Sequence, residues 1–402
     1  MEQTEEGNLA EISLKHIIIE LNIIFCFALV LWVIVQTNNA FGGPIEDLKP
    51  GEWYEVPNSN LSAVLPNPIP PGYTGPKAII VSWSGGAYDT KRDRFIVWGG
   101  GHGDYGGNEI YTFDLNTLKW SRIWGPSAAI PPVGSPCSEK YSDGNPASRH
   151  TYGGLQYLPK VDGLFSHGGS LYCGSGGTSP ATWVFNFAAS QWSQKANLPQ
   201  GSYCELSVVT GYDPRTGHIF MASPTWELTE YNPTANTWTK RGDNSIGWSK
   251  KTATIDAKRN KFVAVGSGTV YVYDLKPRGT LIRRSLMTTG DATMMDASYP
   301  GLDYDPISDR IVAWHGGKYV YTLDIDTRAW TKISPAPTNI FIPTQAPSEG
   351  THGRWRYIPS KNVFITVNSI DENVFVYRLS SGNRPPPGTT KPAAPANVHA
   401  YR

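Results

Sequence analysis

The sequence predicts an all-β fold, a β-propeller of six blades, and three observations lead to this prediction. A spacing of six residues from an Asp or Asn to a Trp recurs four times. A turn that resembles Tyr-Asp-Pro, followed by an apolar run, recurs six times. The 402-residue chain is also rich in Gly (41), Pro (32), Tyr (21) and Trp (14). Such a composition is typical of many short strands joined by tight turns, and repeats of this length indicate a propeller.

The first repeated spacing marks two strands joined by a polar turn. After the glycine run Gly99–Gly101, the alternating segment Ile110–Phe113 predicts a half-buried strand. We expect the Asp or Asn to accept hydrogen bonds from the turn backbone, and the Trp to pack between blades. The four copies are Asp114/Trp120, Asn186/Trp192, Asn232/Trp238 and Asp324/Trp330.

The second repeated feature is the turn between the first two strands of each unit. Its six copies begin at Tyr88, Tyr157, Tyr212, Ile255, Tyr304 and Tyr357. Apolar runs such as Phe95–Trp98 and Ile311–Trp314 follow the turns, and glycine pairs follow three of the runs. Each unit therefore has the order strand 1, turn, strand 2, Gly-rich loop, strand 3, Asp-to-Trp turn, strand 4.

The last unit is incomplete. Its third strand, Val374–Tyr377, is followed by Ser380–Gly382 with no Trp. A single strand around Trp53, in the segment 52–57, can supply the missing fourth strand. Closure of this kind removes the open edge of the ring. A seventh blade would have to lie in 58–84 or in the insert Gly125–Ala147, and neither segment shows a strand pattern.

The glycine pairs, the aromatic residue after them and the Asp-to-Trp spacing resemble kelch repeats. The chain is similar to the kelch and galactose-oxidase-like β-propellers over residues 45–381, and we place the propeller domain at 44–381. This resemblance implies the fold but leaves the function open, because kelch propellers include both enzymes and binding scaffolds.

The two ends of the chain are expected to lie outside the propeller. Residues 1–43 form a leader that contains a hydrophobic helix, with thirteen apolar residues at Ile23–Val35 and nineteen positions if counted from Ile17. Thirteen suits a signal peptide, whereas nineteen is near the minimum for a membrane span. We expect an extracytoplasmic protein that is either secreted or anchored to the membrane. Residues 382–402 are rich in Pro and Ala and are expected to be a disordered tail.

The cysteine content and the charge balance limit the disulfides, cofactors and partners that we expect. Cys26 lies in the apolar segment, and Cys137, Cys173 and Cys204 are expected to form one disulfide with one free thiol, or else three buried thiols. No spacing indicates a metal site, so the cofactor is unknown. Lys and Arg (35) balance Asp and Glu (34), so nothing favours nucleic acid as a partner. The glycine run precedes no helix, which disfavours a phosphate site.

The candidate site residues gather where the loops enter strand 1. In a propeller, strand 1 lines the channel, and the 2–3 loops emerge on the same face as the connections between blades. This geometry brings five of the eight histidines to one face near the axis, namely His102, His150, His167, His315 and His352. Other candidates at these entries are Arg149, Tyr152, Glu205, Lys250, Lys251, Tyr299, Arg354 and Arg356, and Asp104 and Tyr105 accompany His102. Such a group would repel itself if charged, so folding alone does not explain it.

The first functional hypothesis is β-elimination on an acidic polysaccharide. This reaction needs a cation to hold the uronate carboxylate, a base of near-neutral pKa and an acid. We expect His102 and His167 as the acid–base candidates, with Tyr152 and Tyr299 as alternative acids. The substrate-binding set is predicted to be Arg149, His150, Glu205, Lys250, His315, His352 and Arg354. Propeller lyases that degrade ulvan are similar in architecture, and this likeness extends only to the fold.

Two alternatives remain open at this stage. A non-catalytic propeller could bind a glycan or a protein loop through the same aromatic and cationic side chains. A copper radical oxidase, as in the galactose-oxidase family, would need a Tyr–Cys crosslink, a second Tyr and two His. The candidates for that chemistry are Tyr172, Cys173, Tyr203 and Cys204.

Overall fold

The structure is a computed structural model that describes residues 43–198, 206–247 and 250–382. The chain divides into two units, residues 1–47 and 48–402. In the first unit, residues 43–47 form a turn in which Asp47 N donates to Gly43 O at 3.1 Å. The predicted hydrophobic helix at 17–35 and the tail after Gly382 lie outside the described residues. Within the described ranges, no helix has the length and apolar character needed to cross a membrane.

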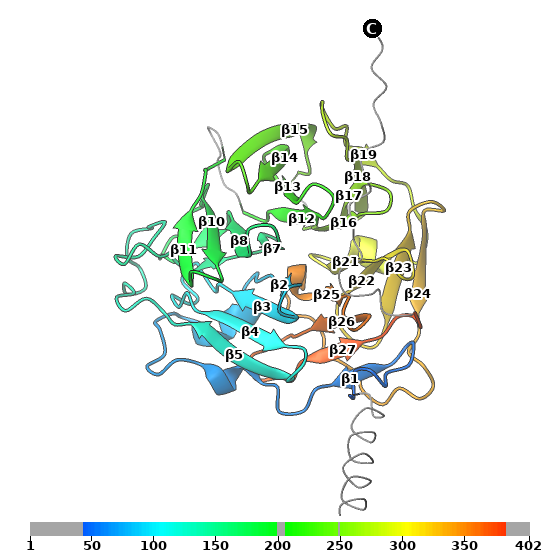
Figure 1. The fold of residues 1–402 in the computed structure, drawn as a ribbon, viewed down its shortest axis with the longest axis horizontal. Coiled ribbons are helices and arrows are strands. Elements are labelled where there is room, and N and C mark those ends of the chain that lie inside the picture. The colour runs from blue at the N-terminus through cyan, green and yellow to red at the C-terminus, as the bar shows by residue number, and fades with distance from the viewer. Residues whose placement is uncertain (1–42, 199–205, 248–249, 383–402) are drawn as a thin grey trace, which may run out of the picture. The chain divides into compact units, whose positions relative to one another are not determined.

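The second unit is a six-bladed β-propeller, as the sequence predicts (Figure 1). Blade 1 contains β2 (Ala87–Asp89), β3 (Arg94–Trp98), β4 (Ile110–Asp114) and β5 (Lys119–Trp124). Blade 2 contains β7 (Leu155–Leu158), β8 (Gly163–His167), β10 (Thr182–Asn186) and β11 (Gln191–Gln194). Blade 3 contains β12 (Val209–Asp213), β13 (His218–Ala222), β14 (Glu227–Asn232) and β15 (Thr237–Ser245).

The remaining three blades follow the same antiparallel order. Blade 4 contains β16 (Thr252–Asp256), β17 (Lys261–Gly266), β18 (Thr269–Asp274) and β19 (Arg284–Ser285). Blade 5 contains β21 (Gly301–Asp305), β22 (Arg310–Trp314), β23 (Val320–Asp324) and β24 (Ala329–Ile333), with β20 (Thr289–Gly290) parallel to β24. Blade 6 contains β25 (Arg356–Ile358), β26 (Val363–Thr366), β27 (Phe375–Tyr377) and β1 (Trp53–Glu55).

The predicted closure of the ring is confirmed. Strand β1 pairs antiparallel with β27, with Trp53 opposite Tyr377. The Trp53 ring is buried, with its centroid 4.7 Å from the Tyr377 ring and 5.6 Å from the Trp314 ring of blade 5. Its Nε1 donates to Lys318 O at 3.2 Å. The N-terminal strand therefore completes blade 6 and also packs against blade 5.

The Asp-to-Trp turns have the structural roles that we expect. Asp114 Oδ1 accepts hydrogen bonds from Asn116 N and Thr117 N, both at 2.8 Å. The tryptophan of the spacing then packs on the preceding blade, as Trp192 does on Trp98 at 5.0 Å. These contacts hold one sheet against the next.

The first turns of four blades share a side-chain contact that the sequence analysis did not predict. In four blades the hydroxyl of the turn tyrosine donates to an Asp or Asn five residues later, which has positive φ. The pairs are Tyr88–Asp93, Tyr157–Asp162, Tyr304–Asp309 and Tyr357–Asn362. Arg92 and Arg259 then extend from one turn to the carboxylate of the next, Asp162 and Asp309, at 2.7 Å.

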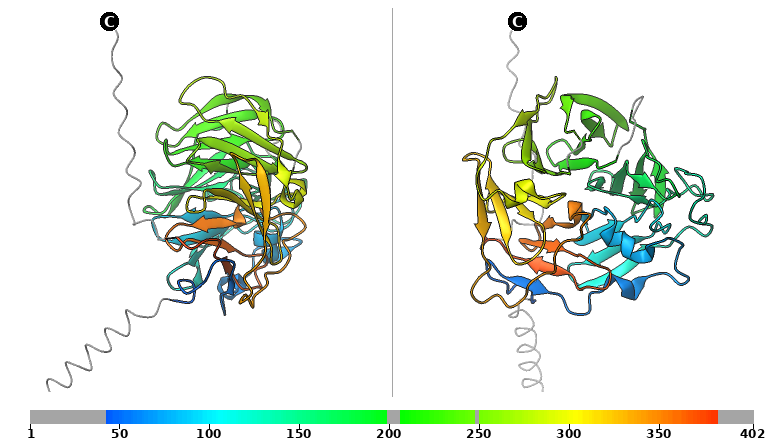
Figure 2. Two further views of the ribbon diagram at one scale, coloured as in Figure 1. Left: turned by 90° about the vertical axis from the view of Figure 1, so that its right-hand side faces the viewer. Right: turned by 180° about the vertical axis from the view of Figure 1, so that it is seen from behind.

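Short elements fill the connections between blades. Segments η1 (Leu61–Val64), η2 (Gly75–Lys77) and α2 (Ala78–Val81) precede blade 1, where η1 contacts β5 and α2 contacts β3. Figure 2 shows the propeller from the side and from behind. The strands β6 (Arg149–His150) and β9 (Ser170–Leu171) pair near blade 2, and α3 (Thr293–Asp296) and η3 (His352–Arg354) precede strand 1 of blades 5 and 6. A disulfide joins Cys137 of the insert to Cys173 of the β8–β10 loop. Cys204 lies outside the described residues.

Closure by β1 gives a direct test of stability. Replacing Trp53 by Ala removes a buried ring that packs on two blades, so we expect a loss of about 3–5 kcal/mol in unfolding free energy. Urea unfolding followed by tryptophan fluorescence measures this change. The control Lys119→Ala changes an exposed side chain on the outermost strand of blade 1 and should leave the midpoint within error. Equal midpoints for the two variants would contradict closure through Trp53.

Candidate functional site

Six residues form a ring where the chain enters strand 1 of each blade. Each of them lies five positions before the Tyr or Ile that begins the first turn of its blade. The ring, called the mouth ring below, consists of Trp83, Tyr152, Ser207, Lys250, Tyr299 and His352. The sequence analysis had singled out four of these residues, but Trp83 and Ser207 were missed.

The backbone of the mouth ring is unusual for such bulky residues. Trp83, Tyr152, Ser207, Tyr299 and His352 have φ between 44° and 57°, in the left-handed region. This conformation allows hydrogen bonds between neighbouring blades, such as Tyr152 N to Trp83 O at 2.6 Å and Tyr299 N to Lys250 O at 2.8 Å. Glycine would adopt it at lower cost. Non-glycine residues in strained backbone conformations cluster at functional sites. We therefore infer that these positions keep large residues because their side chains are needed at the site.

The aromatic side chains of the mouth ring form a connected network. The Tyr299 ring lies 4.5 Å from the His352 ring and 6.4 Å from the Tyr152 ring. His150 packs between Tyr152 at 6.1 Å and Trp83 at 4.9 Å. The predicted convergence of His150, Tyr152, Tyr299 and His352 near the axis therefore corresponds to direct ring contacts.

The loop after the glycine run brings His102 to this network. His102 is exposed, has φ of 48°, and its ring lies 5.7 Å from that of His150. Its backbone is fixed to the β8–β10 loop, because His102 N donates to Ser170 O and Cys173 N donates to His102 O. A Cβ at Gly176 would lie 2.5 Å from the His102 ring, so this position requires glycine.

A carboxylate orients His150. Asp104 Oδ2 lies 2.9 Å from His150 Nε2, and Asp104 also accepts a hydrogen bond from the Thr74 hydroxyl. Burial raises the pKa of Asp104, but the hydrogen bonds from His150 and Thr74 outweigh this and hold the pKa below its usual value. Burial lowers the pKa of His150, although Asp104 opposes this effect. At neutral pH the pair is therefore a carboxylate beside a neutral imidazole.

The opposite side of the mouth ring is also hydrogen-bonded. Ser207 Oγ lies 2.9 Å from the Tyr299 hydroxyl, and His352 Nε2 lies 2.7 Å from Glu349 O. Burial raises the pKa of Tyr299, and burial together with the charge of Arg354 lowers that of His352 to about 3. Tyr299 is therefore a neutral hydroxyl and His352 a neutral imidazole at physiological pH.

One exposed aromatic side chain lies beside the loop that carries His102. Tyr73 is 80% exposed, and its backbone N donates to Gly103 O at 2.9 Å, next to His102. Trp83 is half-buried. Tyr73 comes from a proline-rich segment that carries no repeat signal, so the sequence offered no way to find it. Together with His102 and Lys250, these two side chains are accessible to a ligand.

Three predicted site residues lie in the protein interior. Arg149 is fully buried and donates to Glu139 Oε1 at 2.8 Å and to Ser179 Oγ at 2.9 Å. Arg354 is fully buried and donates to Val367 O at 3.1 Å and to two other carbonyls. His167 is buried against Trp238, with Nδ1 2.9 Å from Thr182 Oγ1, so the structure does not bring it together with His102.

The other predicted residues lie at the edge of the site. Lys250 is exposed at its position in the mouth ring, and Glu205 lies outside the described residues. His315 is half-buried with Nδ1 3.2 Å from Thr351 Oγ1, beside His352, and burial lowers its pKa.

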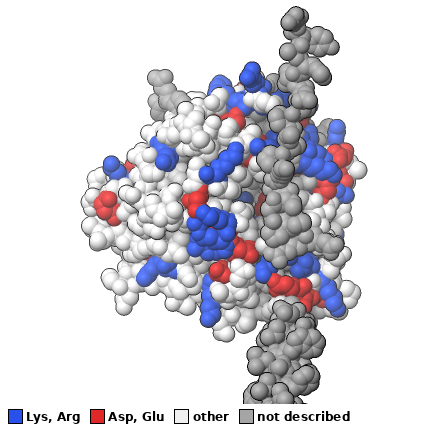
Figure 3. Space-filling model, viewed as in Figure 1, with Lys and Arg blue, Asp and Glu red and all other residues white. Residues whose placement is uncertain are grey.

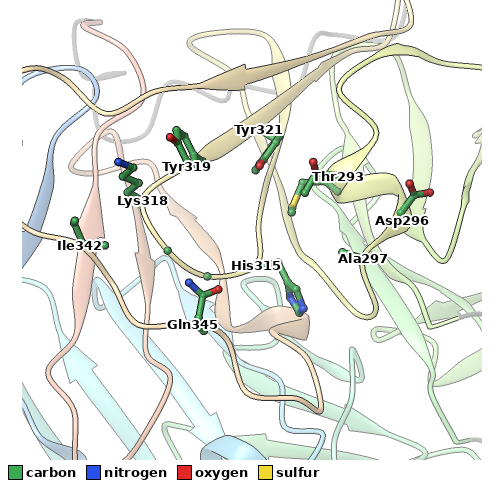
Figure 4. Close-up of a pocket in the computed structure, with 12 residues that line it drawn as sticks. Thr293, Asp296, Ala297, His315, Lys318, Tyr319, Tyr321, Ile342 and Gln345 are labelled. Carbon is green, nitrogen blue, oxygen red and sulfur yellow. The ribbon is translucent and has the colours of Figure 1, made fainter.

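His315 also lines a cleft of about 800 Å³ next to the mouth ring. Figure 4 shows Tyr319 and Tyr321 on one side of this cleft and Thr293 and Asp296 of α3 on the other. Lys332 Nζ lies 4.1 Å from the centre of the Tyr319 ring, a cation–π contact. The cleft offers a second aromatic surface, and its His315 contacts Thr351, the residue next to His352.

The copper oxidase hypothesis loses one of its candidates. Cys173 forms the disulfide with Cys137, so its sulfur cannot also form a thioether with a tyrosine. Tyr203 and Cys204 lie outside the described residues. In the part of the chain that the structure describes, no group of three or more His, Cys, Asp or Glu side chains is placed to hold a metal ion.

The face seen in Figure 3 carries interspersed positive and negative side chains.

The neutral His352 gives a prediction about pH. Its folded pKa of about 3 lies below the ordinary value of 6.5, so the unfolded chain binds more protons between these values. The stability that this group contributes is present above pH 6.5 and is lost as the pH falls towards 3. We therefore expect the difference in Tm between wild type and His352→Gln to shrink as the pH falls from 7.5 to 4. A difference that stays constant would contradict a neutral His352.

Comparisons with known proteins identify no family for this chain. No protein-family model and no curated protein matches the chain. A solved structure of a protein of unknown function from Bacteroides thetaiotaomicron is 12% identical with a TM-score of 0.45, covering 81% of this chain and 75% of that one. An auxiliary nutrient binding protein from Bacteroides ovatus is 11% identical with a TM-score of 0.47, covering 76% and 71%. Similarity at this level carries no information about ligand or activity, and the kelch resemblance stays a prediction.

Proposed function

We propose that this protein is a glycan-binding propeller whose ligand lies on the mouth ring. The observation that carries the proposal is that four large side chains, those of Trp83, Tyr152, Tyr299 and His352, stand on left-handed backbone at the entries to strand 1. Bulky residues in this conformation point to a functional demand on their side chains. The exposed Tyr73 lies beside the loop that carries His102, and the half-buried Trp83 packs on His150 at 4.9 Å.

The chemistry of these groups suits a sugar ring. Aromatic faces pack against the C–H faces of a pyranose, and histidine, tyrosine and carboxylate groups make hydrogen bonds to its hydroxyls. Ligand sites commonly combine an apolar wall with a few polar groups of this kind. The mouth ring, Tyr73 and the Asp104–His150 pair supply both parts.

Binding is favoured over β-elimination because of the positions of the arginines. An eliminase needs a cation that reaches the uronate carboxylate. Arg149 and Arg354, the predicted cations, are buried and donate their hydrogen bonds to protein acceptors. Lys250 is exposed at the mouth ring, so an acidic glycan remains a possible ligand.

The proposed location is extracytoplasmic. The apolar segment 17–35 suits an export signal or a membrane anchor. The Cys137–Cys173 disulfide supports this location, since such bonds persist in oxidising compartments.

Glycan binding is tested with a panel of neutral and acidic polysaccharides. We expect the full chain to bind at least one polymer in affinity electrophoresis or calorimetry. Tyr73→Ala and Trp83→Ala should each weaken that binding about tenfold or more, because aromatic side chains dominate binding surfaces. The control Tyr54→Ala removes an aromatic ring from blade 6, where it packs on Phe341, and should leave affinity unchanged. Absence of binding to every polymer, or equal affinity in all variants, would refute the proposal.

A second candidate function, β-elimination, is favoured by the Asp104–His150 pair. A base oriented by a carboxylate can remove the proton next to a uronate carboxyl group. His150 Nδ1 makes no hydrogen bond within the described residues, and Tyr152, a possible acid for the leaving oxygen, lies beside it. The roles first assigned to His102 and His167 would pass to His150 and Tyr152.

Elimination has its own signature. It creates a carbon–carbon double bond conjugated to the carboxyl group, which absorbs near 235 nm. An enzyme would produce this absorbance from an acidic polymer, and His150→Gln would abolish it while polymer binding persists. No absorbance from any acidic polymer that binds the protein would exclude the lyase and leave the binding function in place.

A further inference from the structure

A second cavity lies at the other end of the inner strands. It has a volume of about 460 Å³ and is lined by the first turns of all six blades. Its rim consists of Thr90, Pro159, Pro214, Ala257, Pro306 and Pro359. Its wall consists of Tyr88, Tyr157, Tyr212, Ile255, Tyr304 and Tyr357. We call this cavity the turn chamber. Its volume lies within the roughly 300–1,000 Å³ range of small-molecule sites.

The wall of the turn chamber presents rings rather than hydroxyl groups. Four of its five tyrosines donate their hydroxyl to the Asp or Asn five residues later in the same turn. These hydroxyls are therefore engaged by the protein, and the aromatic rings together with the prolines face the cavity. The wall and rim suit an apolar body.

The floor of the turn chamber is polar. The residues before five of the six wall residues contribute to it, namely Gln156, Gly211, Thr254, Asp303 and Arg356. The Asp303 carboxylate is already engaged, because it accepts hydrogen bonds from Thr254 Oγ1 at 3.0 Å and from the backbone N of Tyr304 and Tyr357 at 2.9 Å.

Arg356 is the charged group of the floor that keeps a donor without a protein acceptor among the described residues. It is 8% exposed, and its Nε and Nη2 donate to Gly86 O at 3.2 and 2.9 Å, with Nη2 also donating to Leu155 O. Its Nη1 makes no hydrogen bond to any residue that the structure describes, although the side chain lines the chamber. Nη1 is therefore available to an acceptor on a ligand in the chamber, and carboxylate oxygens make the strong, charge-assisted hydrogen bonds of this kind.

We propose that the turn chamber binds a small carboxylate with an apolar ring, its carboxyl group on Arg356 and its ring against the tyrosines and prolines. A carboxylate oxygen is the strongest acceptor available to a guanidinium N–H group. A neutral sugar fits less well, because the wall tyrosines leave few free partners for its hydroxyls. The site uses none of the residues of the mouth ring, so the test of this proposal is independent of the test of glycan binding.

The test uses benzoate and cyclohexanecarboxylate as probes, with benzyl alcohol and glucose as neutral comparisons. Calorimetry or saturation-transfer NMR on the full chain should detect both carboxylates more strongly than either neutral probe. Arg356→Gln should weaken carboxylate binding at least tenfold while leaving benzyl alcohol unchanged, because only the charge-assisted bond is lost.

A plug variant keeps the test valid if Arg356→Gln does not fold. Thr90 is exposed on the rim, so Thr90→Trp should block the chamber without disturbing the core and should abolish binding of both carboxylates. The matched control Thr117→Trp adds the same ring to an exposed turn of the same blade outside the chamber and should bind like wild type. Absence of carboxylate binding, binding that survives Thr90→Trp, or preference for glucose or for a peptide of residues 383–402 would overturn the proposal.

Discussion

The packing of aromatic side chains between neighbouring sheets is the interaction on which the rest of this structure depends. Each blade has apolar residues on both faces, so no blade can bury its side chains without a blade on each side. Trp192 fills the space against blade 1, and Trp53 does so between blades 5 and 6. The ring must therefore close, and strand β1, which begins the propeller in sequence, has to pair with the last strand.

Closure fixes the register of the inner strands, and that register sets the chemistry at both ends of the channel. Counting from the first residue of each turn, position −5 forms the mouth ring, position −1 the floor of the turn chamber, and position +2 its rim. One repeat thus produces two different environments. Histidine and hydrogen-bonded tyrosine side chains lie at the N-terminal ends of the inner strands, whereas proline and tyrosine rings lie at their C-terminal ends.

The sequence was sufficient for the blades, because turn signals and strand alternation are local. The convergence of His150 with Tyr152 was predictable for the same reason, since both lie just before a strand 1. The burial of Arg149 was not predictable, because its partner Glu139 lies in an insert without repeats. Aligning the six copies at position −5 would have revealed Trp83, whereas no repeat points to Tyr73.

Three arginines near strand 1 are buried, and a comparison of their hydrogen bonds explains why only one of them is assigned a binding role. Arg149 donates to a carboxylate and Arg354 to carbonyl oxygens of the protein. These two side chains therefore stabilise the loops that they join. Arg356 donates to Gly86 and Leu155, its side chain lines a cavity, and its Nη1 has no acceptor among the described residues. Burial alone cannot separate these roles, since all three are buried. What distinguishes a structural arginine from a binding one is whether its last donor already has an acceptor.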